Sequence, residues 1–117
     1  MSSEKSVESS GGVFTDILPL SELPPGGQHV HLVGMTRILV CHTESGELFA
    51  VFDVCPHARQ PLAGGRVTGN KIICPKHGAC FDLQSGSPLN GVTKASLETL
   101  PVRVTSGRIE VYLPKAS

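Results

Sequence analysis

The chain has 117 residues, which suffices for one small domain. Ten Lys and Arg residues balance ten Asp and Glu residues, so the formal net charge is zero, and this argues against nucleic-acid binding through bulk electrostatics. Tryptophan is absent and aromatic residues make up only 4% of the chain, so the core must be built mainly from Val, Ile and Leu.

The first residues and the overall hydropathy pattern indicate no membrane partner. Residues 1–6 lack the apolar stretch of a signal peptide. No run of eighteen or more apolar residues predicts a transmembrane helix. We therefore expect a cytoplasmic protein. Residues 1–12 are rich in Ser, Glu and Gly and are predicted to form a disordered tail, followed by a single domain over residues 13–117.

From Val13 onwards, short apolar runs are separated by Gly, Pro and Ser, and no segment keeps a 3.6-residue period over several turns. The pattern predicts an all-β domain of many short strands. After the turn-rich residues 21–27, strands are expected at 29–33, 37–42, 48–54 and 71–73, with turns at 44–47 and 67–70. The segments 100–105 and 108–113 alternate in period two around Ser106-Gly107 and predict a hairpin.

Two short pairs of metal-binding residues dominate the middle of the chain. Cys55-Pro56-His57 follows one predicted strand, and Cys74-Pro75-Lys76-His77 follows another, with sixteen residues between His57 and Cys74. Two Cys and two His are the ligand set of a Rieske 2Fe–2S centre, where imidazoles replace thiolates on one iron. Zinc is the alternative, but zinc fingers usually keep like ligands together, whereas each pair here supplies one of each type.

The sequence around these pairs resembles the Rieske iron–sulfur family. The similarity continues through Leu62, Gly65, Gly78, Phe81 and Asp82. It implies one 2Fe–2S cluster held by Cys55, His57, Cys74 and His77, in loops within about residues 54–84. It also implies an antiparallel β-sandwich base with a small inserted cluster-binding subdomain, in which the loop around Pro88 would form a third cover.

Four positions distinguish this chain from the high-potential members of the family. Those members carry an additional Cys at the positions of Gln60 and Lys76, which form a disulfide, and hydroxyl-bearing Ser and Tyr at the positions of Ala79 and Phe81. Hydrogen bonds from such hydroxyls to the cluster would stabilise the reduced state. Because both hydroxyls are missing, the resemblance implies a low-potential centre.

A short low-potential Rieske chain is similar to the ferredoxin component of bacterial aromatic-ring-hydroxylating dioxygenase systems. The resemblance implies a carrier, not an enzyme, that takes single electrons from a flavin-dependent reductase to a terminal oxygenase. The chain is too short to be the oxygenase, which also needs a mononuclear iron domain. Two alternatives stay open: the small Rieske subunit of an assimilatory nitrite reductase, and a structural zinc-binding module.

The other Cys, His and basic residues give weaker signals. Cys41 and Cys80 are expected to be small buried apolar residues, with a disulfide between them as an alternative. His29 and His31 alternate onto one strand face and are expected to be ordinary edge or surface residues. Arg59 and Lys76 lie next to the histidine loops, either as a positive collar or as solvated loop charges.

Overall fold

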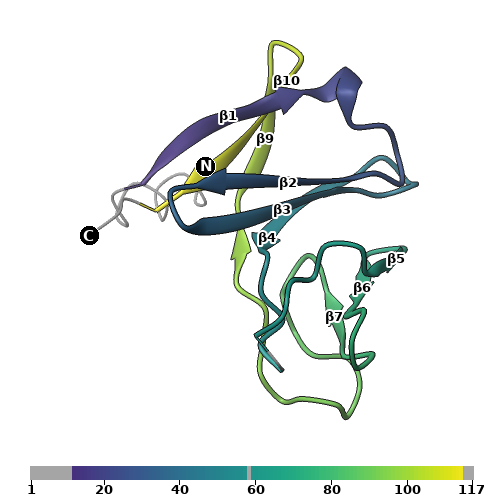
Figure 1. The fold of residues 1–117 in the computed structure, drawn as a ribbon. Coiled ribbons are helices and arrows are strands. Elements are labelled where there is room, and N and C mark those ends of the chain that lie inside the picture. The colour runs from purple at the N-terminus through teal and green to yellow at the C-terminus, as the bar shows by residue number, and fades with distance from the viewer. Residues whose placement is uncertain (1–11, 58, 115–117) are drawn as a thin grey trace.

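The computed structural model describes residues 12–57 and 59–114, so the predicted disordered tail lies outside the described residues except for Gly12. Within these ranges the chain forms three antiparallel sheets and one short 3-10 helix (Figure 1). In chain order the elements are β1 (Val13–Pro19), η1 (Leu20–Glu22), β2 (Gln28–Val33), β3 (Thr36–His42), β4 (Leu48–Phe52), β5 (Arg66–Thr68), β6 (Lys71–Ile73), β7 (Cys80–Asp82), β8 (Thr99–Leu100), β9 (Val102–Thr105) and β10 (Arg108–Leu113).

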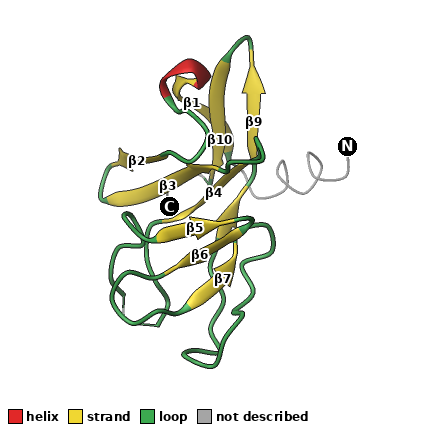
Figure 2. Ribbon diagram, turned by 90° about the vertical axis from the view of Figure 1, so that its right-hand side faces the viewer, coloured by secondary structure: helices red, strands yellow, loops and turns green. Residues whose placement is uncertain are grey.

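The base of the molecule is a sandwich of two sheets, with strand orders β1-β10-β9 and β2-β3-β4-β8 (Figure 2). The predicted strand over residues 100–105 is interrupted at Pro101, where the chain passes from one sheet to the other. Proline has no N–H to give to a sheet ladder. Its carbonyl instead accepts a hydrogen bond from the Tyr112 N–H at 2.9 Å. Pro101 therefore forms the corner that joins the two sheets.

Strand β3 is buried on both faces, which explains its continuous apolar run. Ile38 and Val40 point into the sandwich core, which also includes Ile109 and Val111 of the opposite sheet. Leu39 and Cys41 point the other way, into a second core that we call the subdomain core. Its buried residues are Leu39, Cys41, Val51, Cys55, Leu62, Ile72, Cys74, Ala79, Phe81, Leu83 and Leu97. The subdomain core joins the base to everything inserted between β4 and β8.

The insertion carries the third sheet, β5-β6-β7, and lies below the sandwich in Figure 1. Two details differ from the sequence expectation. Strand β4 ends at Phe52, before Val54, and residues 66–68 pair with β6, so that the predicted turn at 67–70 narrows to Gly69 and Asn70. The predicted all-β sandwich with an inserted subdomain is confirmed as the architecture of the described residues.

At Gly65 the backbone passes close to the carbonyl groups of Leu62 and Ile73. A Cβ at this position would fall inside contact distance of the Ile73 carbonyl oxygen and 2.9 Å from that of Leu62. Both obstacles are backbone, so neither can rotate away. Only a residue without a side chain fits here.

We expect Gly65→Ala to lower the free energy of unfolding by about 1–3 kcal/mol, because backbone must shift to admit the methyl group. Gly91→Ala is the matched control, since a Cβ at Gly91 meets nothing within 4 Å, and it should change stability by less than about 0.5 kcal/mol. Denaturant unfolding of the two variants measures the difference. Equal stability would mean that the close packing at Gly65 does not matter.

Candidate metal centre

The first ligand loop begins where β4 has ended and is closed by its own backbone. The Cys55 N–H donates to the Gln60 carbonyl at 2.7 Å, and the Cys55 carbonyl accepts from the Arg59 N–H at 2.7 Å. To make this turn Arg59 takes a φ of 55°, in the left-handed region that non-glycine residues seldom adopt. The loop is therefore a defined turn that starts and ends on the backbone of Cys55.

The second ligand loop repeats this hydrogen-bonded frame. The Cys74 N–H donates to the Ala79 carbonyl at 2.7 Å, and the Cys74 carbonyl accepts from the Gly78 N–H at 3.1 Å. The residue four places after the Cys is again left-handed, here Gly78 with a φ of 74°. The two loops differ in their histidines, because His57 follows its Cys by two residues and His77 by three.

The four predicted ligands are arranged as two like pairs. Cys55 and Cys74 are 0% and 1% exposed, and their side chains are joined by a hydrogen bond. His57 and His77 are exposed, and their rings meet edge to face with centroids 4.9 Å apart. Among residues 12–57 and 59–114, no three Cys, His, Asp or Glu side chains gather as a single-ion site would require. Two pairs suit a two-iron centre, with thiols at a buried end and imidazoles at the surface.

The surroundings of Cys74 favour its thiolate. Burial alone would raise the pKa of this thiol, but backbone hydrogen bonds from Lys76 and His77 and the side-chain hydrogen bond with Cys55 act against burial, and the net effect lowers the pKa. The nearby positive charge of Lys76 acts in the same direction. A thiol must be deprotonated to bind a metal, so the lowered pKa favours the form of Cys74 that can act as a metal ligand.

Asp53 fixes the first loop to the base, and sequence reasoning missed it. Its carboxylate is buried, and one oxygen accepts hydrogen bonds from the Leu62 and Ala63 N–H groups, both at 2.8 Å. The other oxygen accepts from the Arg37 guanidinium, with Nε and Nη2 each at 3.0 Å. A lone acidic residue in an apolar run, two residues before a Cys, was the signal that could have revealed it.

Two amide side chains hold the loops from other sides. Gln28 on β2 donates to the Gly65 carbonyl at 2.8 Å and accepts from the Gly64 N–H at 3.0 Å. Asn90 donates to the Gly78 carbonyl at 2.9 Å and accepts from the Cys80 N–H at 3.3 Å. The two partners of each hydrogen bond are 10 to 37 residues apart in the chain, so local sequence patterns do not reveal these contacts.

The remaining candidates of the sequence analysis lie around this centre. Pro88 forms an isolated bridge with buried Phe81, next to the second ligand loop. Cys41 is buried, and burial first and the charge of Asp53 second raise the pKa of its thiol to about 12. Cys80 is half-buried, and both Cys41 and Cys80 are free thiols, not the alternative disulfide.

His29 and His31 are half-buried neighbours on edge strand β2, with ring centroids 6.3 Å apart. Among the described residues β2 pairs with β3 alone, so it forms one edge of its sheet. Arg59 and Lys76 are both exposed, as either the positive collar or the solvated-charge interpretation requires.

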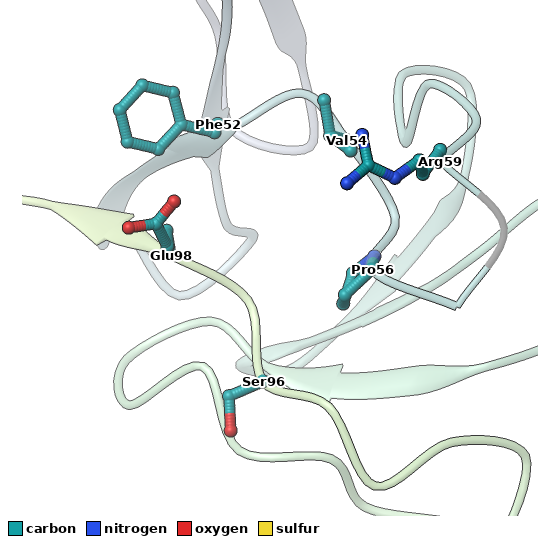
Figure 3. Close-up of a pocket in the computed structure, with 6 residues that line it drawn as sticks. All are labelled: Phe52, Val54, Pro56, Arg59, Ser96 and Glu98. Atoms are coloured by element: carbon teal, nitrogen blue, oxygen red, sulfur yellow. The ribbon is translucent and has the colours of Figure 1, made fainter.

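A cavity of about 370 Å³ lies beside the first ligand loop. Figure 3 shows Phe52, Val54 and Pro56 on its walls, with the Arg59 guanidinium and the Glu98 carboxylate entering from different sides. Ser96 completes the lining. The cavity separates this loop from the chain segment that returns to β8, so one flank of the loop borders open space.

The fold and the two-plus-two donor set define an iron–sulfur protein of the Rieske class. The model of the Rieske [2Fe-2S] domain family matches residues 14–101, and the chain belongs to this family. The cofactor is therefore one Rieske 2Fe–2S cluster, in preference to the zinc alternative. The donors fit it, since two buried thiols and two exposed imidazoles are the ligand types that such a cluster takes.

Two relatives illustrate the sequence similarity. The ferredoxin component of the naphthalene 1,2-dioxygenase system of Pseudomonas aeruginosa is 28% identical over 103 residues, which cover 86% of this chain and 95% of that protein. The anthranilate 1,2-dioxygenase ferredoxin subunit of Burkholderia cepacia is 32% identical over 65 residues, 56% of this chain and 60% of that protein.

Solved structures show the same fold. A chain from the complex of oxygenase and ferredoxin in carbazole 1,9a-dioxygenase superposes with a TM-score of 0.78 and 25% identity, covering 90% of this chain and 98% of that chain. A Mycobacterium tuberculosis protein described as an NADH-dependent nitrite reductase small subunit gives a TM-score of 0.79 with 25% identity and the same coverage. Within the described part of the chain, no helix is long and apolar enough to cross a bilayer.

Proposed function

We propose that Cys55, His57, Cys74 and His77 hold the 2Fe–2S cluster, the two thiolates on one iron and the two imidazoles on the other. The observation that carries this proposal is the pairing of buried thiols and of exposed imidazoles on two loops with the same backbone frame. No other Cys or His lies in either loop between Cys55 and His77.

We propose further that the chain is a one-electron carrier, not an enzyme, that serves a ring-hydroxylating oxygenase. The bound cluster supplies one-electron redox chemistry, and the protein supplies burial at the thiol end and access at the imidazole end. The relatives named as dioxygenase ferredoxins and the ferredoxin–oxygenase complex of carbazole dioxygenase support this function. A flavin-dependent reductase as electron donor and a cytoplasmic location complete the proposal.

The small subunit of a nitrite reductase is the second candidate, because the Mycobacterium tuberculosis structure superposes as well as the carbazole dioxygenase complex. The two functions differ in the electron acceptor. Reduced protein that is reoxidised by a terminal oxygenase with its aromatic substrate, and not by a nitrite reductase large subunit, would favour the first.

Replacing any of the four proposed ligands, for example Cys55→Ser or His77→Ala, should abolish the visible spectrum of the cluster and the low-temperature electron paramagnetic resonance of the dithionite-reduced protein. Each substitution removes a donor that the remaining residues cannot replace. Cys80→Ser is the control, and it should retain both signals because Cys80 lies outside the donor set. Stoichiometric zinc without iron in the wild-type protein would contradict the proposal.

We expect Lys76→Glu to slow electron delivery to the terminal oxygenase at low ionic strength, with an effect that shrinks as salt is added. Lys76 is exposed beside His77, where its charge can steer docking, and salt screens such steering. Lys71→Glu, an equal change of charge at the far end of β6, should have little effect. Stopped-flow reoxidation measures both rates, and equal rates for Lys76→Glu and wild type would show that Lys76 is a solvated loop charge only.

The wild-type reduction potential should lie near the low end of the Rieske range, around −150 mV. The double variant Ala79→Ser, Phe81→Tyr should raise it by roughly tens of millivolts or more, since a hydrogen bond to a charged acceptor contributes at most about 1.5–3 kcal/mol. Both positions are fully buried next to the second loop, where a hydroxyl can be directed at the cluster. Protein-film voltammetry decides the matter, and an unchanged or lowered potential would refute this explanation of the tuning.

A further inference from the structure

A buried negative charge lies beside the core that contains the two proposed thiolate ligands. The Asp53 side chain is fully buried, and its carboxylate is held by the N–H groups of Leu62 and Ala63, just after the first loop, and by Arg37. Asp53 is two residues from Cys55 in the chain. The Leu62 N–H donates one of these hydrogen bonds, and the Leu62 side chain packs in the subdomain core with both Cys55 and Cys74. The carboxylate therefore lies at the border of the core that contains both proposed thiolate ligands.

The charge of Asp53 reaches into this core. It is one of the two causes, after burial, of the raised pKa of the Cys41 thiol, which belongs to the same core. Coulomb interactions decay slowly where water is excluded, so a group close enough to affect Cys41 can also act on neighbouring buried sites. Any charge that is added at Cys55 and Cys74 lies within this field.

Arg37 compensates only part of that charge. Its side chain is 42% exposed, whereas that of Asp53 is 0% exposed, so solvent screens the cation more than the anion. The guanidinium also approaches from the β3 side, whereas the other carboxylate oxygen faces Leu62 and Ala63, which directly follow the first ligand loop. The pair therefore leaves a net negative potential toward the ligand loops.

We propose that Asp53 lowers the reduction potential of the centre and that Arg37 limits this effect, so that the pair sets the potential through its charges. The inference rests on the proposed ligation by Cys55 and Cys74. Reduction adds one negative charge to the centre, and a fixed anion nearby opposes this addition. Asp53 thus positions the first loop and also acts on the reduction potential of the centre through its charge.

The test uses two charge-neutralising substitutions in the cluster-containing protein. Asp53→Asn keeps an acceptor oxygen for Leu62 and Ala63 but removes the negative charge, and we expect the midpoint potential to rise. Arg37→Gln removes the compensating positive charge, and we expect the potential to fall. The double variant should lie between the two. A loosened loop would shift both single variants in the same direction, so opposite signs distinguish charge from structure.

The ion pair between Arg103 and Glu110 supplies matched controls. It joins β9 and β10 in the sheet that carries no ligand loop, with its atoms 2.7 Å apart. Arg103→Gln and Glu110→Gln change the net charge by the same amounts and should leave the potential unchanged. The potentials are measured by protein-film voltammetry, after the visible spectrum has shown that each variant contains the cluster.

Shifts of the same sign in Asp53→Asn and Arg37→Gln, or shifts no larger than those of the controls, would overturn the proposal. If Asp53→Asn fails to assemble the cluster, Arg37→Gln alone decides: a fall supports the proposal, and a rise or no change refutes it. A wild-type protein without iron would instead refute the ligand assignment, so the two failures are distinguishable.

Discussion

The structure depends on one buried carboxylate that joins the base to the ligand-bearing insertion. Asp53 follows the last residue of β4 and binds the backbone N–H groups of Leu62 and Ala63 and the guanidinium of Arg37. A buried anion is tolerated only where donors surround it, and loss of those donors would leave an expensive unpaired charge. Asp53 therefore holds the end of β4 together with the residues that directly follow the first ligand loop.

From this anchor the two loops are built on one plan. In each loop the Cys N–H donates to the carbonyl of the fifth residue after it, and the Cys carbonyl accepts from the N–H of the fourth residue after it. That fourth residue has a left-handed backbone conformation. The first loop uses Arg59 at this position and the second uses Gly78, so the first accepts a conformation that costs about 1 kcal/mol or more for a non-glycine residue. The shared frame places both thiols inside, and the unequal histidine spacing brings the rings edge to face at the surface.

This arrangement separates two requirements of an electron carrier. The thiol end is enclosed by the subdomain core and by side-chain contacts from three different parts of the chain, through Gln28, Asp53 and Asn90. Such enclosure restricts rearrangement around the proposed cluster when its charge changes. The imidazole end stays exposed, where a partner can approach within electron-transfer distance. One end of the site therefore provides rigidity and the other provides access.

Local sequence was sufficient to propose the donor set and to predict most of the strands. The spacing of the Cys and His pairs predicts the ligands Cys55, His57, Cys74 and His77, and apolar patterns predict β3 and β10. Both signals lie in residues that are neighbours in the chain. Only the tertiary structure decided that the thiols meet each other, that Pro101 turns the chain between sheets and that Asp53 anchors Leu62 and Ala63. These features arise from contacts between residues distant in the chain, and such contacts leave no periodicity or spacing in a single sequence.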